Sequence, residues 1–139
     1  MTTTPWLTVA DAMTFDPIVV RVDAPIEEAQ HKLQASHISG LPVVDERGTL
    51  VGVISQTDLL QEMPSTGAML RGRPSGLRVG ELMTSPPITV PMTVSLVEAA
   101  RVMRAHAVHR VVVLDDDRPI GVLSASDYVA LIADGWPGA

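Results

Sequence analysis

Gly52-Val53-Ile54-Ser55-Gln56-Thr57-Asp58 occurs twice in this chain, the second time as Gly121-Val122-Leu123-Ser124-Ala125-Ser126-Asp127. Each copy follows a run of branched apolar residues and opens a polar segment, which predicts a strand, a tight turn and the start of a helix. The serine can cap that helix, or the free N–H groups of the first turn can hold a phosphate. The aspartate three residues later either completes a capping box or offers two acceptor oxygens to a pair of sugar hydroxyls.

The repetition extends over most of the chain. Residues 7–14 align with 77–84, and 43–45 align with 113–115, with the same offset of 70 positions. After the acidic loops the offset falls by one, as a one-residue deletion in a hairpin loop would cause. We therefore predict an N-terminal extension (1–6), a first repeat (7–62), a linker loop (63–76), a second repeat (77–132) and a C-terminal tail (133–139). Residues 135–139 of this tail are expected to be mobile unless Trp136 docks on a partner.

Each repeat predicts the same order of elements, β-α-β-β-α after a short helical turn. In the first copy the turn covers 9–13 with Thr8 as its cap, and an extended segment begins at 17–20. Asp23, and Thr93 in the second copy, are the predicted caps of the next helix. A hairpin of 41–44 with 50–54 and a helix from Ser55 to about Met63 complete the repeat. One such unit buries too little surface alone, so we expect two copies to pack through their sheets.

Composition limits the classes of function. Apolar residues make up 46% of the 139 residues and aromatic residues 3%, so the core must be aliphatic. The formal net charge of −6 argues against a nucleic-acid partner, since phosphate binding needs a basic face. The absence of cysteine excludes disulfides, thiolate metal sites and thiol catalysis. No apolar run is long enough to span a membrane and the N-terminus lacks a signal-peptide pattern, so we expect a cytoplasmic protein without membrane contact.

Chemistry-bearing residues are sparse. The histidines His31, His37, His106 and His109 include one pair three residues apart, but no carboxylate joins that pair convincingly, and we predict no metal site. The sequence has no nucleophile–base pair and no Walker-type loop. We therefore expect no enzymatic activity.

The order of the motifs resembles the CBS domain, a family named after cystathionine β-synthase. The resemblance rests on Met-Thr at 13–14, Pro-Ile at 17–18, Glu-Ala at 28–29, Leu-Pro-Val-Val-Asp at 41–45 and Gly-Val-Ile-Ser-x-x-Asp at 52–58, each with its counterpart in the second repeat. It covers nearly the whole chain, and the tandem copies are similar to a CBS pair. It implies an α/β (α+β) fold in which two β-α-β-β-α repeats pack through their sheets about a pseudo-twofold axis and leave two clefts. It also implies a homodimer, a flat disc of four repeats.

The resemblance further implies a ligand in these clefts: AMP, ADP, ATP, S-adenosylmethionine or a dinucleotide. Asp58 and Asp127 then bind the ribose hydroxyls, and serine and threonine hydroxyls with the helix N-termini approach the phosphates. The start of the first strand offers backbone groups to the adenine. The candidate binding residues are Thr14, Pro17, Ile18, Gly40, Leu41, Pro42, Ser55, Thr57, Asp58, Thr84, Pro87, Ile88, His109, Arg110, Val111, Ser124, Ser126 and Asp127.

A basic pair distinguishes the two repeats. His109-Arg110 stands where the first repeat has Ser39-Gly40, and family members that bind phosphates often carry a basic pair there. Arg110 offers a charged fork to phosphate, or it is a surface arginine that pairs with an acidic loop. The sequence leaves open which cleft Arg110 serves, but the two clefts should be unequal. The linker arginines Arg71 and Arg73, with Arg78, belong either to a solvated loop or to a lid over an anion.

Two functions follow as alternatives. The first is a regulatory, energy-sensing module in which a nucleotide bridges both repeats and shifts the population toward a closed form. The second is a scaffold without ligand, in which the Ser-x-x-Asp segments are only caps and the module acts through dimerisation and a regulated partner protein.

Overall fold

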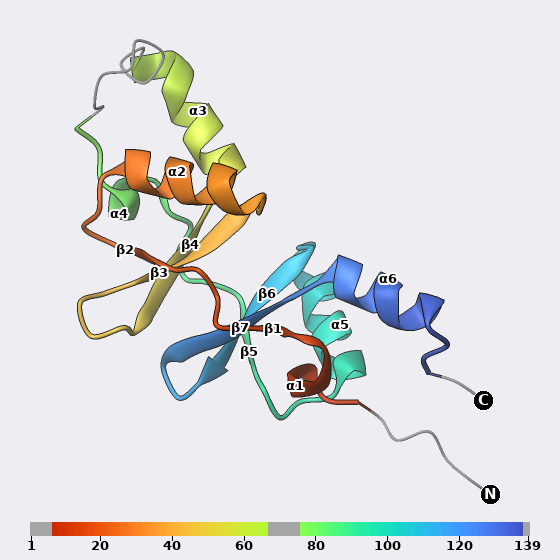
Figure 1. The fold of residues 1–139 in the computed structure, drawn as a ribbon. Coiled ribbons are helices and arrows are strands. Elements are labelled where there is room, and N and C mark those ends of the chain that lie inside the picture. Colours follow the sequence, from red (N-terminus) through yellow and green to blue (C-terminus); the bar gives the residue numbers. More distant parts are fainter. Residues whose placement is uncertain (1–6, 67–75, 138–139) are drawn as a thin grey trace, which may run out of the picture. The chain divides into compact units, whose positions relative to one another are not determined.

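The computed structural model describes residues 7–66 and 76–137 (Figure 1). They form a mixed α/β fold, as predicted. In chain order the elements are α1 (Val9–Ala12), β1 (Thr14–Phe15), β2 (Val20–Arg21), α2 (Ile26–Ser36), β3 (Gly40–Val44), β4 (Leu50–Ser55), α3 (Gln56–Thr66), α4 (Val79–Leu82), β5 (Thr89–Pro91), α5 (Leu96–His106), β6 (Arg110–Asp115), β7 (Arg118–Ser124) and α6 (Ala125–Ala133). The chain divides into two compact units: unit 1 comprises Met1–Pro17 and Ile88–Ala139, and unit 2 comprises Ile18–Pro87.

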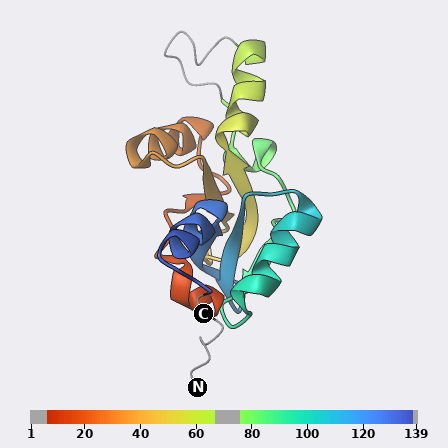
Figure 2. The same cartoon turned by 90° about the vertical axis from the view of Figure 1, so that its right-hand side faces the viewer.

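Unit 2 is a three-stranded sheet in the order β2-β3-β4, with helices α2 and α3 against one face (Figures 1 and 2). β2 runs parallel to β3, and β3 and β4 form the predicted antiparallel hairpin. Successive side chains of a strand point to opposite faces, so alternate residues face the helices. The core of unit 2 contains Val20, Ala24, Ile26, Ala29, Leu33, Leu41, Val43, Ile54, Leu59 and Val79.

Unit 1 repeats this plan with a four-stranded sheet in the order β1-β7-β6-β5. β5 is parallel to β6, while β7 is antiparallel to both of its neighbours. Helix α5 packs on one face of this sheet (Figure 2). The core of unit 1 contains Val9, Met13, Val90, Leu96, Ala99, Met103, Val111, Val113 and Leu123, which are aliphatic as the composition predicts.

The segment that opens each sequence repeat packs in the unit built mainly from the other repeat. Helix α1 and strand β1 belong to unit 1, where Thr14 lies opposite Val122. Helix α4 belongs to unit 2, where Thr84 forms a bridge with Val53. The compact unit and the sequence repeat are therefore different divisions of the chain, which the alignment of the repeats does not reveal.

Identical backbone bonds hold the two exchanged segments. The amide of Val9 donates to the carbonyl of Val94 at 2.9 Å, and the amide of Val79 donates to the carbonyl of Ala24 at 2.9 Å. Val94 lies in the loop before α5, and Ala24 lies in the loop before α2. Helix α1 is therefore bonded to the first of these loops, and helix α4 to the second.

The glycine of the repeated motif has a packing role. A Cβ at Gly121 would lie 2.6 Å from the sulfur of Met13 and 2.9 Å from the carbonyl oxygen of Thr14. A Cβ at Gly52 would meet Met83 and Thr84 at the same two distances. Only glycine lets the exchanged segment approach β4 or β7 this closely.

Several predicted boundaries differ from the structure. Thr8 caps α1 as predicted, but Asp23 and Thr93 cap no helix. Helix α5 begins after Ser95, whose hydroxyl accepts the amide of Glu98 at 3.0 Å, and α2 begins after Pro25. The predicted caps fall too early because the loops before these helices bond to the exchanged segments.

Two further boundaries shift. The extended segment predicted from residue 17 becomes a strand only at Val20, whereas Thr14–Phe15 forms a separate short strand on the edge of β7. Helix α3 continues to Thr66, so the predicted linker loop of 63–76 begins inside a helix. Arg71 and Arg73, proposed for a lid, lie outside the described residues.

The described part of the C-terminal tail, up to Pro137, folds back on unit 1. Trp136 packs against the core of unit 1, with its ring centroid 6.4 Å from that of Tyr128. The chain reaches this position through a turn in which Trp136 donates its amide to the carbonyl of Leu131 at 2.9 Å. Trp136 therefore docks on its own chain.

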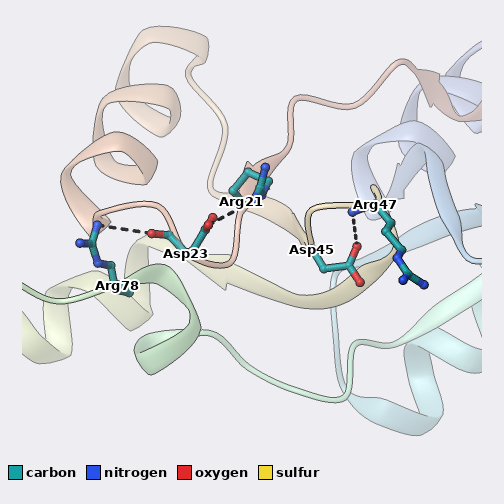
Figure 3. Close-up of polar contacts among 5 residues, drawn as sticks. All are labelled: Arg21, Asp23, Asp45, Arg47 and Arg78. Carbon is teal, nitrogen blue, oxygen red and sulfur yellow. Dashed lines mark hydrogen bonds and ion pairs between the residues drawn. The ribbon is translucent and has the colours of Figure 1, made fainter.

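Polar contacts fix the loops of unit 2 (Figure 3). Arg21 forms an ion pair with Asp23 at 3.1 Å, and a guanidinium nitrogen of Arg78 donates to the carbonyl of Asp23 at 3.4 Å. In the β3–β4 turn one oxygen of Asp45 accepts the amides of Arg47 at 2.9 Å and Thr49 at 3.0 Å. The Thr49 amide is the main cause that holds the pKa of Asp45 below its ordinary value.

No helix within 7–66 and 76–137 is long and apolar enough to cross a membrane.

Candidate functional site

Three predicted residues of unit 1 lie on one face of its sheet. Arg110 lies opposite Ser124 in the β6–β7 ladder, and Thr14 lies opposite Val122 in the β1–β7 ladder. Val111, Val113 and Leu123 occupy the alternate positions and face the core. Because side chains alternate along a strand, Thr14, Arg110 and Ser124 point to the face opposite the core.

The N-terminus of α6 brings two more predicted residues to the same end of the sheet. Oδ2 of Asp127 accepts the amide of Ser124 at 2.8 Å and the hydroxyl of Ser124 at 3.1 Å. The hydroxyls of Ser124 and Ser126 are 2.8 Å apart. Oδ1 of Asp127 accepts no hydrogen bond from any residue in the described ranges. Asp127 is thus a cap through one oxygen, and its second oxygen is available to a ligand.

The amides of the first turn of α6 are only partly available. Ala125 donates its amide to the carbonyl of His109 at 2.8 Å, so this N–H cannot hold a phosphate. The amide of Ser126 has no partner among the residues that the structure describes. The predicted phosphate contact at the helix N-terminus is therefore reduced to the Ser126 amide and the serine hydroxyls.

Arg110 is half-buried, and its guanidinium makes no hydrogen bond or ion pair within the described part of the chain. No acidic side chain in the described ranges pairs with Arg110, as the alternative of a surface arginine beside an acidic loop would require. The side chain of His109 is exposed, and within 7–66 and 76–137 no group of three or more histidine and carboxylate side chains could hold a metal ion. Arg110 and Asp127 belong to the same unit.

Unit 2 has residues equivalent to those of unit 1, except that no positively charged side chain stands at the position of Arg110. Gly40 lies opposite Ser55, and Thr84 bridges to β4. Asp58 accepts the amide of Ser55 through Oδ2 at 2.9 Å, and the hydroxyl of Ser55 accepts the amide of Asp58 at 3.1 Å. The structure describes no bond to Oδ1 of Asp58. The two sets therefore share a carboxylate and hydroxyls and differ in charge at the position of Arg110.

The remaining predicted residues are distributed unevenly. The side chains of Leu41 and Val111 are buried in the two cores, so only their backbone could contact a ligand. Pro42 alternates with Leu41 and points to the same face as Ser55. Ile88 packs against the unit 1 core, whereas Ile18 and Thr57 are exposed. Pro17 ends the first segment of unit 1, and Pro87 ends unit 2.

A groove lies apart from these residues, between α2 and α3 of unit 2. Its volume is about 210 Å³, and it is lined by Gln30, Leu33, Gln34, Gln56, Leu59 and Leu60. None of the candidate binding residues is among them.

Tyr128 was missed by the sequence analysis. It follows Asp127 directly, and its hydroxyl donates to the carbonyl of Leu96, the first residue of α5. Burial, and secondly the charge of Asp127, raise the pKa of Tyr128 to about 12. The first repeat has Leu59 at the equivalent position, and this difference between the repeats was the available signal.

Tyr128 is the only tyrosine, so its titration can be read directly from near-ultraviolet phenolate absorbance. We expect a midpoint near 12 in the folded protein, against 10.0 in the denatured chain. Because the folded pKa is raised, the stabilisation is complete below pH 10 and is lost as the pH rises toward 12. Tyr128→Phe should remove this extra loss of stability, and a folded-state midpoint at the denatured value would refute the assignment.

Comparisons with known proteins agree with this architecture. The sequence profile of the CBS domain matches residues 9–65 and 79–134. The chain is 29% identical over 124 residues to the uncharacterized protein YlbB of Bacillus subtilis, covering 86% of this chain and 78% of YlbB. Two longer curated relatives are spanned only to 33% and 24% of their length.

Solved structures share the fold. The CBS domain pair of protein MJ0100, in complex with 5-methylthioadenosine and S-adenosyl-L-methionine, has a TM-score of 0.79 and 27% identity, covering 94% of this chain and 98% of that one. CBSX2 of Arabidopsis thaliana, in complex with AMP, has a TM-score of 0.78 and 33% identity, covering 91% and 96%. With two tandem matches to the family profile over most of its length, the chain belongs to the CBS domain family as a CBS domain pair.

Proposed function

We propose that this chain is a regulatory module that senses an adenosine ligand, and that unit 1 takes a phosphorylated one. Oδ1 of Asp127 accepts a ribose hydroxyl, and Arg110 binds the phosphate together with the hydroxyl and amide of Ser126. Thr14 and Pro17 contribute to the adenine end. Binding of an adenosine ligand in general is supported by relatives whose structures were solved with AMP and with S-adenosyl-L-methionine.

One observation supports the nucleotide most directly: Arg110 is half-buried, without a described partner, on the sheet face that also carries Ser124. A half-buried guanidinium loses part of its hydration, and without an anion nothing offsets that cost in free energy. Two oxygens of a phosphate can accept its two parallel N–H donors. The carboxylate of Asp127 would repel a phosphate, so it is suited to the neutral sugar hydroxyls instead. The positive Arg110 and the negative Asp127 therefore favour one orientation of the ligand, with its phosphate at Arg110 and its ribose at Asp127.

Unit 2 should prefer a different member of the same ligand class. Gly40 stands at the position of Arg110 and supplies no charge. The negative Asp58 is then the charged side chain of the equivalent set. A nucleoside without phosphate, or a cationic one such as S-adenosylmethionine, suits this set better than ATP, ADP or AMP.

The test is calorimetric titration with AMP, adenosine and S-adenosylmethionine, on wild type, Arg110→Ala and the control Arg101→Ala. Arg101 is an exposed arginine of α5 in the same unit, paired with Glu98. We expect Arg110→Ala to weaken AMP binding by about 10- to 100-fold, as the loss of a charge-assisted hydrogen bond pair implies. Adenosine binding should be nearly unchanged, and Arg101→Ala should behave as wild type.

Thermal unfolding gives an independent reading. A ligand at 100 times its dissociation constant should add about 2.7 kcal/mol to the free energy of unfolding. If AMP, adenosine and S-adenosylmethionine all leave the melting temperature unchanged, the sensor function is refuted.

The scaffold without ligand is favoured by one observation. Leu60 of α3 and Val129 of α6, at equivalent positions of the two repeats, have 61% and 67% of their surface exposed. Exposed apolar side chains on helices suit a protein interface, such as that of a homodimer or of a regulated partner. A dimer in sedimentation experiments together with no adenosine binding would favour this function.

A further inference from the structure

Helix α6 carries Ser126 and Asp127 but is weakly anchored by its own side chains. None of its residues is buried, whereas α2 buries Ile26, Ala29 and Leu33 and α5 also buries three. Val129 and Ile132 of α6 have more than half of their surface exposed. The position of this helix therefore depends on a few partly buried contacts.

Tyr128 and Leu131 of α6, and Trp136 after it, pack on the unit 1 core, and of these Tyr128 and Trp136 also contact each other. The hydroxyl of Tyr128 donates to the carbonyl of Leu96, which connects the first turn of α6 to the start of α5. The ring of Trp136 lies against Tyr128, with an angle of 59° between the rings, and both side chains pack on the unit 1 core. Aromatic pairs in tilted arrangements are favourable beyond their burial alone.

The backbone after α6 is folded to bring Trp136 back to the helix. Asp134 donates its amide to the carbonyls of Ala130 and Leu131 at 3.1 Å, and Gly135 donates to Ile132 at 3.0 Å. Gly135 has a φ of 105°, a conformation that favours glycine. The turn thus returns the chain onto the helix that it ends.

We propose that Tyr128 and Trp136 form a clasp that fixes the first turn of α6 on unit 1 and thereby positions Ser126 and Asp127. Both are positioning residues, since neither is proposed to touch the ligand. The effect on ligand affinity rests on the proposed function, but the effect on the helix does not.

The sequence of unit 2, residues 18–87, contains no aromatic residue, so the Tyr–Trp pair has no equivalent there. Leu59 stands in place of Tyr128 and is itself buried, with 3% of its surface exposed. It anchors α3 by ordinary core packing. Helix α3 is therefore an internal control for changes made to the clasp.

The indole nitrogen of Trp136 suggests a conservative variant that tests the clasp. Nε1 of Trp136 is buried and has no hydrogen-bond partner within the described residues. A buried donor without an acceptor opposes docking. Trp136→Phe keeps an aromatic ring and removes this donor, so it should preserve the clasp, whereas Trp136→Ala should open it.

The primary experiment is amide hydrogen exchange on the full chain, comparing wild type, Tyr128→Phe, Trp136→Ala and Trp136→Phe. Ile132→Ala is the matched control, because Ile132 lies on α6 with 59% of its surface exposed. Within 125–128, we expect exchange of the amides of Ala125, Asp127 and Tyr128 to rise at least fivefold in Trp136→Ala and measurably in Tyr128→Phe. Exchange at 56–60 of α3 should not change, and Trp136→Phe and Ile132→Ala should resemble wild type.

The second measurement is the affinity for AMP, made under conditions in which the variants and wild type are folded to the same extent. We expect Trp136→Ala to weaken AMP binding about fivefold or more and Trp136→Phe to restore it. Unchanged exchange at 125–128 in Trp136→Ala refutes the clasp. If exchange rises while AMP affinity stays that of wild type, the positioning role is refuted. If wild type binds no AMP, the proposed function fails, and the exchange result alone decides on the clasp.

Discussion

Gly121→Ala is expected to destabilise the protein by about 2 kcal/mol, because the new methyl group has no room. It would lie 2.6 Å from the sulfur of Met13 and 2.9 Å from the carbonyl oxygen of Thr14. The sulfur belongs to a flexible side chain, but the carbonyl belongs to the backbone of β1, so this edge strand must move away from β7. At the size of this chain, the melting temperature should fall by roughly 4–8 °C.

The sign of this effect is itself diagnostic. Replacing a glycine by alanine, where the backbone already suits both, stabilises a protein by about 0.4–1 kcal/mol through the unfolded chain. Gly80→Ala is a milder comparison: the first repeat carries Ala10 at the equivalent position, but a Cβ at Gly80 would lie 2.8 Å from Cγ2 of Val22 and 3.2 Å from its carbonyl oxygen, so a loss of stability smaller than that of Gly121→Ala is expected. A melting temperature for Gly121→Ala equal to or above that of wild type would contradict the close approach of β1.

The same substitution should also test whether β1, which comes from the other repeat, contributes to binding at unit 1. Displacing β1 moves Thr14 away from Ser124, so Gly121→Ala should weaken binding at unit 1. Gly52→Ala should do the equivalent to Thr84 in unit 2. Each variant is expected to affect one set of candidate residues and to leave the other intact, which titration with AMP and S-adenosylmethionine can distinguish.

Much of the fold could be predicted because the sequence contains two copies of the same repeat. Two aligned copies fix the strands and helices better than one, and the runs around Val43 and Val113 are core strands as predicted. The short helix capped by Thr8 was also predicted. These features depend on local pattern, which a sequence displays directly.

The features that were missed depend on contacts between distant parts of the chain. Nothing near Gly52 indicates that its neighbour is Met83, and nothing near Asp23 indicates that the following loop bonds to α4. Tyr128 and Trp136 were missed for the same reason, since their contact forms only after the tail folds back. The candidate site residues were named from family resemblance, and the structure adds the register that groups Thr14, Arg110 and Ser124.

Asp127→Asn is expected to abolish most ligand binding at unit 1 and to leave the fold unchanged. In the structure Oδ2 of Asp127 caps its own helix by accepting the amide of Ser124 at 2.8 Å. The amide oxygen of asparagine can accept the same bond, so only the negative charge at the helix N-terminus is lost, and the stability should fall by about 0.3–1 kcal/mol. The second oxygen becomes an NH₂ group, which cannot accept from a ribose hydroxyl and retains no charge.

The loss should be about 10- to 150-fold in affinity for AMP and for adenosine alike, since a hydrogen bond to a charged group contributes about 1.5–3 kcal/mol. This pattern differs from that of Arg110→Ala, which should affect AMP alone. Asp58→Asn is the parallel variant in unit 2 and should leave binding at unit 1 intact. A variant Asp127→Asn that binds adenosine as wild type does, with an unchanged melting temperature, would mean that the aspartate is a cap and nothing more. The two roles of the Ser-x-x-Asp segment are thus separable, because the helix uses one oxygen of the carboxylate and a ribose would use the other.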